Sequence, residues 1–593
     1  MYNYYNKRIA LVSSELKSLE RRFFLFYIFR LLSFISFISF TFWFFASGEL
    51  WQAAASAAFF IFFIFVVKTD LKWVKQQRLL KSRLLVNQNE LRYLEYDYFD
   101  FDQGEEFVKL NPHLAGDFDL FGRGSLFQYL SRSVLHGGRK KLAASLSFQN
   151  LDVNIISNRQ KAIKELSENP MFLEDFQALA LQSKETGKER ENLHLWLNSS
   201  VSSLISSWIL GIYPFAVFLF LVLVYFSVVP GSVLILILFL AFGIIFSKKK
   251  IVDQVHNQLG KSARNLEVYE QLICLIEKQT FSCSYLKELQ SIFIDKTSGA
   301  SLCLRQLYKL LERFDYRYNF IAAIILNILA LFDLQMVRLL GKWKSKYKNE
   351  VISWLDTLDE FDAMSGFARF AMNNESNVCT AELSEKEFEF SAKHLAHPLI
   401  SAKNRISNNV YFSGQPKVLV ITGANMAGKS TFLRTLAVNI ILAINGAPAV
   451  ARYFKFSPCF IMSSINIRDS LSQKASYFYS ELIRIRQIID YIKDNPKTMV
   501  ILDEILRGTN TRDKQAGSIG LIDKLIAMNA VVVIATHDLT IGDLDKKYPR
   551  IVSNHCFEVE LDNDQLVFDY KLKEGVSQKL NASFLMRKMG VID

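Results

Sequence analysis

Residues 418–431 read VLVITGANMAGKST, and this stretch determines the fold expected for the last third of the chain. An apolar, β-branched strand pattern comes first, the pattern GxxxxGK(S/T) follows, and apolar residues at helical spacing come next. In such strand–loop–helix units, backbone N–H groups of the loop and of the helix N-terminus bind phosphate oxygens. The stretch therefore predicts a phosphate-binding loop in an α/β domain with a central, mostly parallel sheet.

The residues expected to bind a nucleotide all lie in this loop. Lys429 is placed to reach the β- and γ-phosphates, and the hydroxyl of Ser430 is placed to bind Mg²⁺. The full set is Gly423, Ala424, Asn425, Met426, Ala427, Gly428, Lys429, Ser430 and Thr431. The pattern thus predicts ATP and Mg²⁺ as cofactors.

Two further strand patterns end in polar residues that suit the same site. TMVILDE at residues 498–504 ends in two carboxylates. We expect Asp503 to bind Mg²⁺ together with Ser430, and Glu504 to orient and activate the attacking water as a general base. VVVIAT at residues 531–536 precedes His537. A histidine at a strand end is usually structural, but its position one predicted helix after the carboxylates favours a role in sensing the γ-phosphate.

These segments resemble those of the DNA mismatch repair MutS family. TGANMAGKST at residues 422–431 is similar to the family's TGPNMGGKST, and DEILRGTNT at residues 503–511 to its DEIGRGTST. HP at 397–398, the segment 469–481 and ATH at 535–537 also resemble the family, in its order, over about residues 390–593. The resemblance implies an ATPase that forms a homodimer with composite sites, in which Ser476 reaches the partner's γ-phosphate.

A few positions depart from the family's pattern. Ala424, Ala427, Leu506, Lys514 and Lys474 stand where the family usually has proline or glycine. None of these changes removes a phosphate or Mg²⁺ ligand. The pattern does not identify the side chain that stacks on adenine, which we expect in the neighbourhood of residues 406–412.

Four apolar stretches upstream predict two membrane hairpins. They are residues 23–47, 51–67, 208–228 and 233–246. A spanning helix needs about 20 apolar residues, and a short turn separates the members of each pair. A signal peptide is the alternative for the first stretch, but a second stretch follows at once without a cleavage pattern. A fifth run, residues 320–332, is short, which favours a buried helix over a spanning one.

Basic residues determine the expected orientation. Lysine and arginine precede the first stretch and follow the second and fourth, whereas the short turns contain neither. By the positive-inside rule, both termini and the nucleotide-binding part lie in the cytoplasm. We therefore expect an integral protein of a bacterial inner membrane, with the lipid bilayer as a partner and the ATPase domain cytoplasmic.

Three regions follow from the stretches and the resemblance. Residues 1–100 form an N-terminal transmembrane hairpin with cytoplasmic flanks. Residues 101–390 form a MutS-like core and lever domain, interrupted by the second hairpin at about 205–247, and residues 391–593 form the ATPase domain. Segments 124–130 and 136–142 resemble the start of the family's core. The fold class is mixed: an α-helical transmembrane and lever region precedes a P-loop, ABC-like α/β ATPase domain.

The resemblance favours an ATP-driven dimer switch at a membrane, acting on DNA or on a protein partner. The net charge of +12 suits either DNA or an anionic membrane, and six cysteines without a CxxC pair indicate a reducing compartment. The first hairpin occupies the place of the family's mismatch-recognition domain, so mismatch recognition is not expected. An ABC-type transporter is the alternative, although the LSGGQ glycines are missing, and a non-hydrolysing scaffold is disfavoured by Lys429, Asp503 and Glu504. The basic residues that could contact DNA phosphates, or form a solvated helix face, are Arg338, Lys342, Lys344, Lys346 and Lys348.

Overall fold

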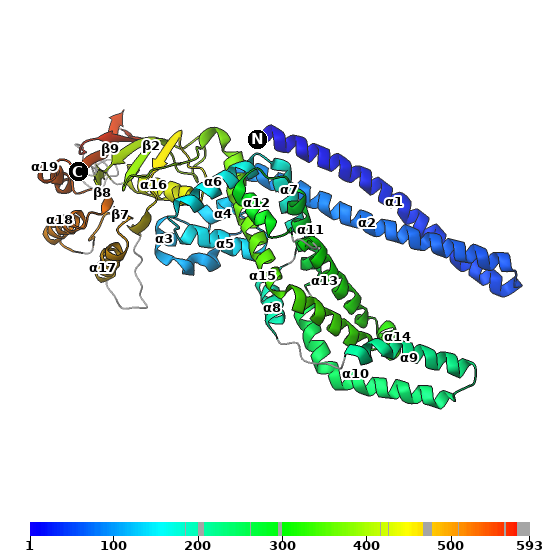
Figure 1. Ribbon diagram of the computed structural model, residues 1–593. Coiled ribbons are helices and arrows are strands. Elements are labelled where there is room, and N and C mark those ends of the chain that lie inside the picture. The colour runs from blue at the N-terminus through cyan, green and yellow to red at the C-terminus, as the bar shows by residue number, and fades with distance from the viewer. Residues whose placement is uncertain are drawn as a thin grey trace.

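The computed structural model describes residues 1–183, 185–199, 207–260, 262–294, 299–414, 417–424, 426–465, 477–507, 509–562 and 565–577. They form a long helical part and, at one end of it, an α/β part (Figure 1). The helices are α1 (Tyr2–Ser47), α2 (Leu50–Leu94), α3 (Pro112–Asp117), α4 (Leu126–Leu130), α5 (His136–Ser147), α6 (Val153–Ser167), α7 (Pro170–Ala180), α8 (Gly187–Asn198), α9 (Ser207–Tyr225), α10 (Gly231–Leu259), α11 (Ala263–Lys278), α12 (Ser284–Ser291), α13 (Ala300–Phe314), α14 (Phe320–Ala330), α15 (Phe332–Asn373), α16 (Lys429–Ile444), α17 (Tyr477–Asp494), α18 (Thr511–Ala527) and α19 (Leu544–Lys547). The strands are β1 (Glu382–Leu383), β2 (Glu389–Leu395), β3 (Asn408–Ser413), β4 (Val418–Gly423), β5 (Tyr453–Phe456), β6 (Phe460–Ser464), β7 (Thr498–Asp503), β8 (Val531–Thr536), β9 (Val552–Asp562) and β10 (Gln565–Glu574).

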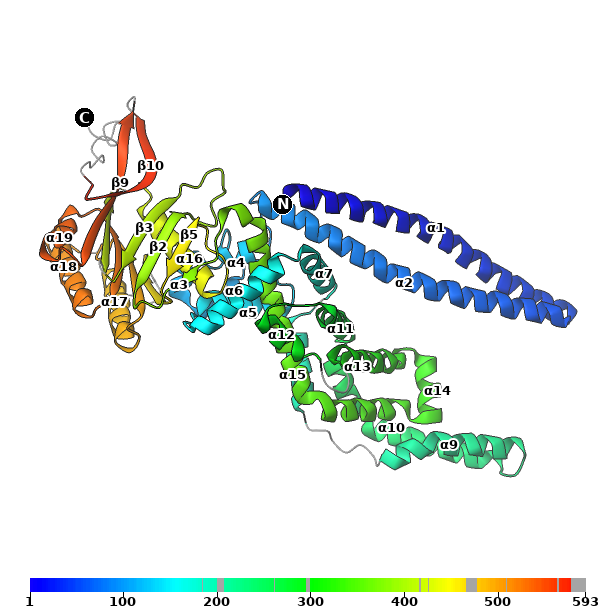
Figure 2. The same ribbon diagram turned by 45° about the horizontal axis from the view of Figure 1, so that its top comes forward.

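Two helical hairpins extend from the helical part, as the apolar stretches predict. Gly48, with a φ of 73°, ends α1 in the left-handed conformation and lets α2 turn back beside it. The second hairpin consists of α9 and α10. Each of these four helices contains a segment long and apolar enough to cross a membrane. Both hairpins point the same way, away from the α/β part (Figures 1 and 2).

Protein does not cover the apolar segments of these hairpins. Between 6% and 11% of the residues in each 18-residue apolar window are buried, and large side chains such as Phe42, Phe218 and Phe239 are exposed. A continuous apolar surface of this extent is unfavourable in water. Near the base of the first hairpin, Arg30 forms an ion pair with Asp70 at 3.0 Å, which compensates its charge.

The expectation that residues 320–332 form a buried helix is wrong. α14 covers Phe320–Ala330 and is followed by a bend of 77° into α15. Phe320 is 77% exposed and Ile321 69% exposed, and Asn327 is the buried residue of this helix. The short length of the run did not show that its large apolar side chains are exposed.

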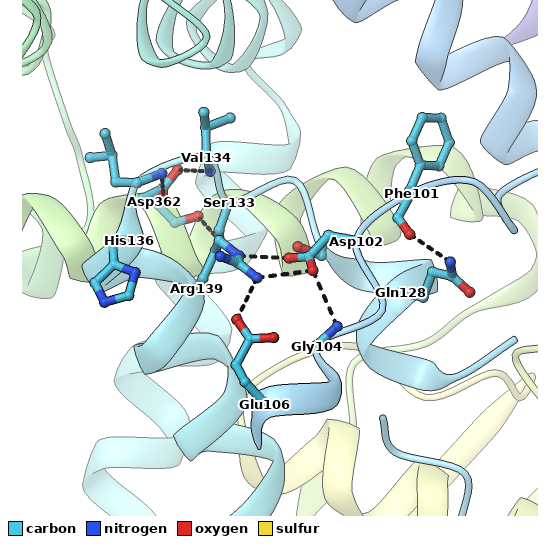
Figure 3. Close-up of polar contacts among 12 residues, drawn as sticks. Phe101, Asp102, Gly104, Glu106, Gln128, Ser133, Val134, His136, Arg139 and Asp362 are labelled. Atoms are coloured by element: carbon cyan, nitrogen blue, oxygen red, sulfur yellow. Dashed lines mark hydrogen bonds and ion pairs between the residues drawn. The ribbon is translucent and has the colours of Figure 1, made fainter. Parts of the chain in front are cut away.

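Helix α15 is the central element of the helical part. Its buried apolar residues form one core with those of α6 to α8, α10, α11 and α13. Gly137 and Gly138 of α5 lie directly on Asp359 and Asp362 of α15, and an added Cβ would stand 2.0 and 2.1 Å from their carboxylate oxygens. The carboxylate of Asp362 also accepts the backbone N–H groups just before α5 (Figure 3). The close approach of α5 to α15 therefore requires both glycines.

The α/β part contains two sheets with α16 between them. The larger sheet has the order β10-β9-β4-β8-β7-β6 and is parallel except for β10. Side chains of α16 share a core with one face of this sheet and with the smaller sheet β1-β5-β2-β3. Helices α17 and α18 pack on the other face of the larger sheet. The central, mostly parallel sheet expected from residues 418–423, 498–503 and 531–536 is confirmed.

A buried polar cluster attaches the first hairpin to the C-terminal end of α15. Arg132 donates to the carboxylate of Glu90 on α2 at 3.1 and 3.2 Å, and Asn373 donates to it at 2.7 Å. The hydroxyl of Tyr5 on α1 donates to Asn373 at 2.7 Å and accepts from Arg369 at 3.4 Å. Burial alone would raise the pKa of Glu90, but Arg132 and Arg369 lower it. Glu90 is therefore the ionised counter-charge of two buried guanidinium groups.

Replacing this carboxylate should destabilise the protein strongly. Glu90→Gln leaves Arg132 and Arg369 buried without a counter-charge, and we expect a loss of about 3–5 kcal/mol in the free energy of unfolding. Denaturant unfolding of the detergent-solubilised protein measures this loss. Asp490→Asn is the matched control, because it removes a carboxylate that pairs with Arg486 and Lys493 on the exposed surface. Equal stabilities of the two variants would contradict the assignment.

Candidate active site

The loop between β4 and α16 has the backbone geometry of an anion-binding turn. Gly423 has a φ of 150°, and a Cβ there would lie 2.6 Å from the carbonyl oxygen of Phe557. Gly428, with a φ of 105°, is the N-cap of α16, which begins at Lys429. Met426 also has a positive φ of 69°. These conformations direct the loop around the N-terminus of a 16-residue helix, where free N–H groups and the helix dipole favour anions.

The side chain of Lys429 lies in the centre of this loop. It is 4% exposed, and its ammonium group donates to the carbonyl oxygens of Gly423 at 2.7 Å and Ala424 at 2.9 Å. Burial lowers its pKa, although Glu504 and Asp503 act in the opposite direction. The loop thus holds a cation at the place where the sequence predicts phosphate contacts.

Ser430 and Asp503 form a pair suited to a divalent cation. The hydroxyl of Ser430 donates to Oδ2 of Asp503 at 2.5 Å, while Oδ1 of Asp503 is buried without a hydrogen-bond partner. Burial raises the pKa of Asp503 despite the hydrogen bond from Ser430. Mg²⁺ prefers oxygen ligands and takes one or two from protein, completing its shell with water and phosphate. The unsatisfied carboxylate oxygen therefore fits the predicted Mg²⁺ site, and these residues would hold the ion.

Glu504 is held in a strained conformation beside the loop. Its φ is 47°, in the left-handed region that non-glycine residues rarely adopt. Its carboxylate lies 4.0 Å from the ammonium of Lys429, 3.2 Å from the guanidinium of Arg507 and 3.4 Å from Nδ1 of His537. The structure therefore brings together Lys429, Ser430, Asp503, Glu504 and His537, as the sequence predicts.

Glu481 supports the segment that follows Glu504. Its buried carboxylate accepts the backbone N–H of Leu506 at 2.6 Å and that of Arg507 at 3.2 Å. Leu506 has a φ of 58°, which explains why glycine suits this position in the family pattern. Here the two hydrogen bonds to Glu481 hold a leucine in that conformation.

A cavity of about 520 Å³ lies next to the loop and includes Lys429, Ser430 and Glu504. Ile406 and Asn408, from the neighbourhood in which we expect the adenine contact, line it. Its other lining residues include His397, Phe557 and Tyr570. Burial and the nearby Arg434 lower the pKa of His397 to about 4, so its imidazole is neutral at physiological pH.

Sequence reasoning did not identify Phe557 or Tyr570. Phe557 lies on β9, which pairs with β4 and places Phe557 opposite Gly423. Tyr570 lies on β10, whose pairing with β9 shifts register between Phe568 and Leu572. No local pattern indicates such a shift. A larger cavity of about 720 Å³, lined by α2, α7, α11 and α13, includes none of the residues predicted for the site.

Two predicted residues and one group of basic residues remain. Asn425 and Ser476 lie outside the described residues. Lys344, a candidate for contacting DNA phosphates, is buried, and its ammonium donates to the carbonyl oxygens of Trp196 and Ser199 at the end of α8. It therefore caps α8, and neither of the two alternatives for it, a DNA contact or a solvated helix face, applies.

Comparison with known proteins agrees with this geometry. Residues 419–586 match the model of MutS domain V. The chain is 30% identical to MutS protein homolog 4 of Mus musculus over 239 residues, which covers 38% of the chain and 24% of that protein. It is 28% identical to the DNA mismatch repair protein MutS of Thermotoga maritima over 252 residues (42% and 31%), and 26% identical to Endonuclease MutS2 of Leuconostoc mesenteroides over 253 residues (41% and 30%).

These matches support membership of the chain in the MutS family. The aligned part spans between 24% and 31% of the length of these relatives. The match to MutS domain V includes Lys429, Ser430, Asp503, Glu504 and His537.

Divalent-cation binding should depend on Asp503 and on pH. Burial raises the pKa of Asp503. When the solution is acidified, its carboxylate is therefore protonated at a higher pH than that of an exposed aspartate. The affinity for the cation falls at that same pH. Electron paramagnetic resonance of Mn²⁺ with the purified protein measures this affinity. Asp503→Asn should abolish binding, whereas Asp543→Asn, at an exposed surface carboxylate, should not change it. Unchanged binding in Asp503→Asn would exclude this residue as a ligand.

Proposed function

We propose that this protein is a membrane-anchored MutS-type ATPase in which ATP binding and hydrolysis switch the conformation of a homodimer. One observation carries the proposal: Lys429, Ser430, Asp503 and Glu504 converge on one glycine-containing loop at a helix N-terminus. The relatives' names support the MutS type, and the family resemblance supports the dimer and the composite site.

The chain's own residues supply most of the proposed chemistry. The loop N–H groups and Lys429 bind the phosphates and offset their charge. Ser430 and Asp503 would hold Mg²⁺, which would supply positive charge beside the bound phosphates. Glu504 accepts a proton from the attacking water and orients it towards the γ-phosphorus. His537, 3.4 Å from Glu504, orients this carboxylate.

Contacts of α16 provide a route from the loop to α15. Near its start, Arg434 pairs with Asp119 of the helical part. At its end, Asn445 donates to the carbonyl oxygen of Ser145 at 2.7 Å and accepts from Arg159 at 3.1 Å. Arg159 also pairs with Glu360 of α15 at 2.6 Å. A movement of α16 on nucleotide binding is thereby transmitted to α15 through packed and charged contacts.

Membrane anchoring is supported by the apolar surface and the ends of the hairpins. The exposed apolar segments of α1, α2, α9 and α10 require an apolar environment. Aromatic residues that suit the membrane–water interface lie at their ends, for example Trp43 and Trp51 at one turn and Trp208 at the start of α9. The basic residues lie at the ends of the hairpins remote from the turns, which supports a cytoplasmic ATPase at an inner membrane.

The ATPase assignment is tested with purified protein in detergent. Glu504→Gln should lower ATP hydrolysis about 10²–10⁴-fold while leaving nucleotide affinity nearly unchanged, because it removes the base and keeps the phosphate contacts. Phosphate release and binding of a fluorescent ATP analogue measure the two effects. Asp538→Asn is the control next to His537 and should keep the wild-type rate. If Glu504→Gln hydrolysed ATP at the wild-type rate, Glu504 would not be the general base.

Adding double-stranded DNA to the same assay, at low and at moderate salt, tests whether DNA is the partner of this ATPase. The relatives named as mismatch repair proteins make DNA the first candidate. Salt-sensitive binding that alters the rate supports a DNA role. If DNA neither binds nor alters the rate, the switch acts on a protein or lipid partner instead.

Thiol labelling tests the orientation in the membrane. In a background with the partly exposed Cys274, Cys283 and Cys379 replaced by serine, we compare Val228→Cys in the turn after α9 with Leu302→Cys on α13. A membrane-impermeant maleimide applied to intact spheroplasts should label Val228→Cys and not Leu302→Cys, and permeabilised cells should label both. The reverse pattern would invert the proposed topology.

A further inference from the structure

Helix α14 carries a stripe of large apolar side chains that no other part of the described structure covers. Phe320, Ile321, Ile324, Ile325 and Leu329 are exposed. Their spacing places them on one side of the helix. The opposite side is held by the protein: Asn327 is buried, and the carbonyl oxygen of Ile328 accepts from the hydroxyl of Tyr213 on α9 at 2.9 Å. One side of this almost wholly apolar helix is therefore held by the protein, and its large apolar side chains are turned away from it.

The direction of α14 differs from that of the hairpin next to it. Figure 2 shows α14 joining the end of α13 to the start of α15, crosswise to α9 and α10. The bend between α14 and α15 is 77°. At 11 residues, α14 is about 16 Å long at 1.5 Å per residue, roughly half the thickness of a bilayer's hydrocarbon core. By itself α14 is too short to span a membrane, and it does not continue the direction of α9 or α10.

A group of charged and aromatic residues marks the level at which α14 lies. In the turn η2 (Asp315–Tyr318), which precedes α14, Arg317 pairs with Asp253 of α10 at 2.7 Å, and Asp315 lies 3.1 Å from the imidazole of His256. Tyr316 and Tyr318 are exposed beside them. Asp253 follows the lysines at 248–250 by one helical turn. Charged pairs, tyrosines and lysines together are typical of the membrane–water interface.

We propose that α14 lies in the plane of the membrane surface, with Ile321 and Ile325 inserted into the boundary between headgroups and acyl chains. This inference rests on the proposed membrane anchoring and assigns a further lipid contact to it. The occupant is lipid because α14 packs against α9 and α10, whose apolar segments are themselves exposed. Interfacial helices bury their apolar side about 5–10 Å into the boundary between headgroups and acyl chains. The lysines and tyrosines beside α14 are residue types that suit this boundary.

This position would set the depth of the start of α15. Leu331, with a φ of 49°, is the single residue between α14 and α15. The carboxylate of Asp333 lies 3.8 Å from the guanidinium of Arg317, and the backbone N–H of Asp333 donates to the side chain of Asn327 at 3.0 Å. Such a short, cross-linked corner leaves little freedom between the two helices. The depth of α14 in the membrane would thereby determine the position of the start of α15, the helix that reaches the α/β part.

Depth-dependent fluorescence quenching tests this arrangement in the full-length protein reconstituted into lipid nanodiscs. In the same cysteine-reduced background, an environment-sensitive fluorophore is attached to Ile321→Cys, to Phe218→Cys in α9 and to Leu302→Cys on α13. These positions are all exposed (69%, 68% and 48%) and differ in predicted depth. The quenchers are lipids that carry a nitroxide either near the glycerol backbone or near the chain end.

The three labels should give three different results. At Ile321 the shallow nitroxide should quench about twofold more than the deep one, as for a side chain at the headgroup boundary. At Phe218 the deep nitroxide should quench more, and at Leu302 neither should quench. Ile321 quenched most by the deep nitroxide would overturn the in-plane arrangement. Ile321 unquenched while Phe218 is quenched would leave the anchoring intact and assign the stripe to a protein contact. Loss of quenching at Phe218 would instead contradict the anchoring itself.

Discussion

The buried carboxylate of Glu90 is the counter-charge of the buried guanidinium groups of Arg132 and Arg369, and the attachment of the first hairpin to the rest of the chain depends on it. It joins α2, the segment after α4 and the end of α15, which are far apart in the sequence. Two buried cations near one anion are unfavourable unless every partner is in place. The neutral side chains of Tyr5 and Asn373 complete the set with further hydrogen bonds. The first hairpin is consequently attached at the point where the helical part meets the α/β part.

The candidate site shows how strain and support are combined. Met426, Glu504 and Leu506 all have positive φ angles, each of which costs about 1–3 kcal/mol for such residues. The strain directs the carboxylate of Glu504 towards Lys429. Glu481 of α17 accepts two backbone hydrogen bonds from Leu506 and Arg507, and thereby holds the turn that follows Glu504. One buried carboxylate therefore joins α17 to the loop after β7.

Motifs with local spacing were the part of the molecule that could be predicted from the sequence. The strand patterns before the loop, Asp503 and His537 describe continuous buried strands, and each polar residue at a strand end reaches the same edge of a parallel sheet. Features that depend on packing between distant elements could not be predicted. The capping role of Lys344, the approach of Tyr570 and the exposed side of α14 each depend on neighbours that no local pattern specifies. Hydrophobicity alone also could not distinguish a helix covered by protein from one that faces outward.

The two hairpins are attached at opposite ends of one helix. The first is attached near Arg369, and the second contacts the start of α15, where Gln335 donates to the carbonyl oxygen of Leu210 at 3.0 Å. With 42 residues, α15 is a strut of about 63 Å. A bilayer that holds both hairpins would therefore fix two points of this strut, so that bending it would require sliding or tilting a hairpin through viscous lipid. Membrane fluidity and thickness would then act as a mechanical load on the nucleotide-binding end.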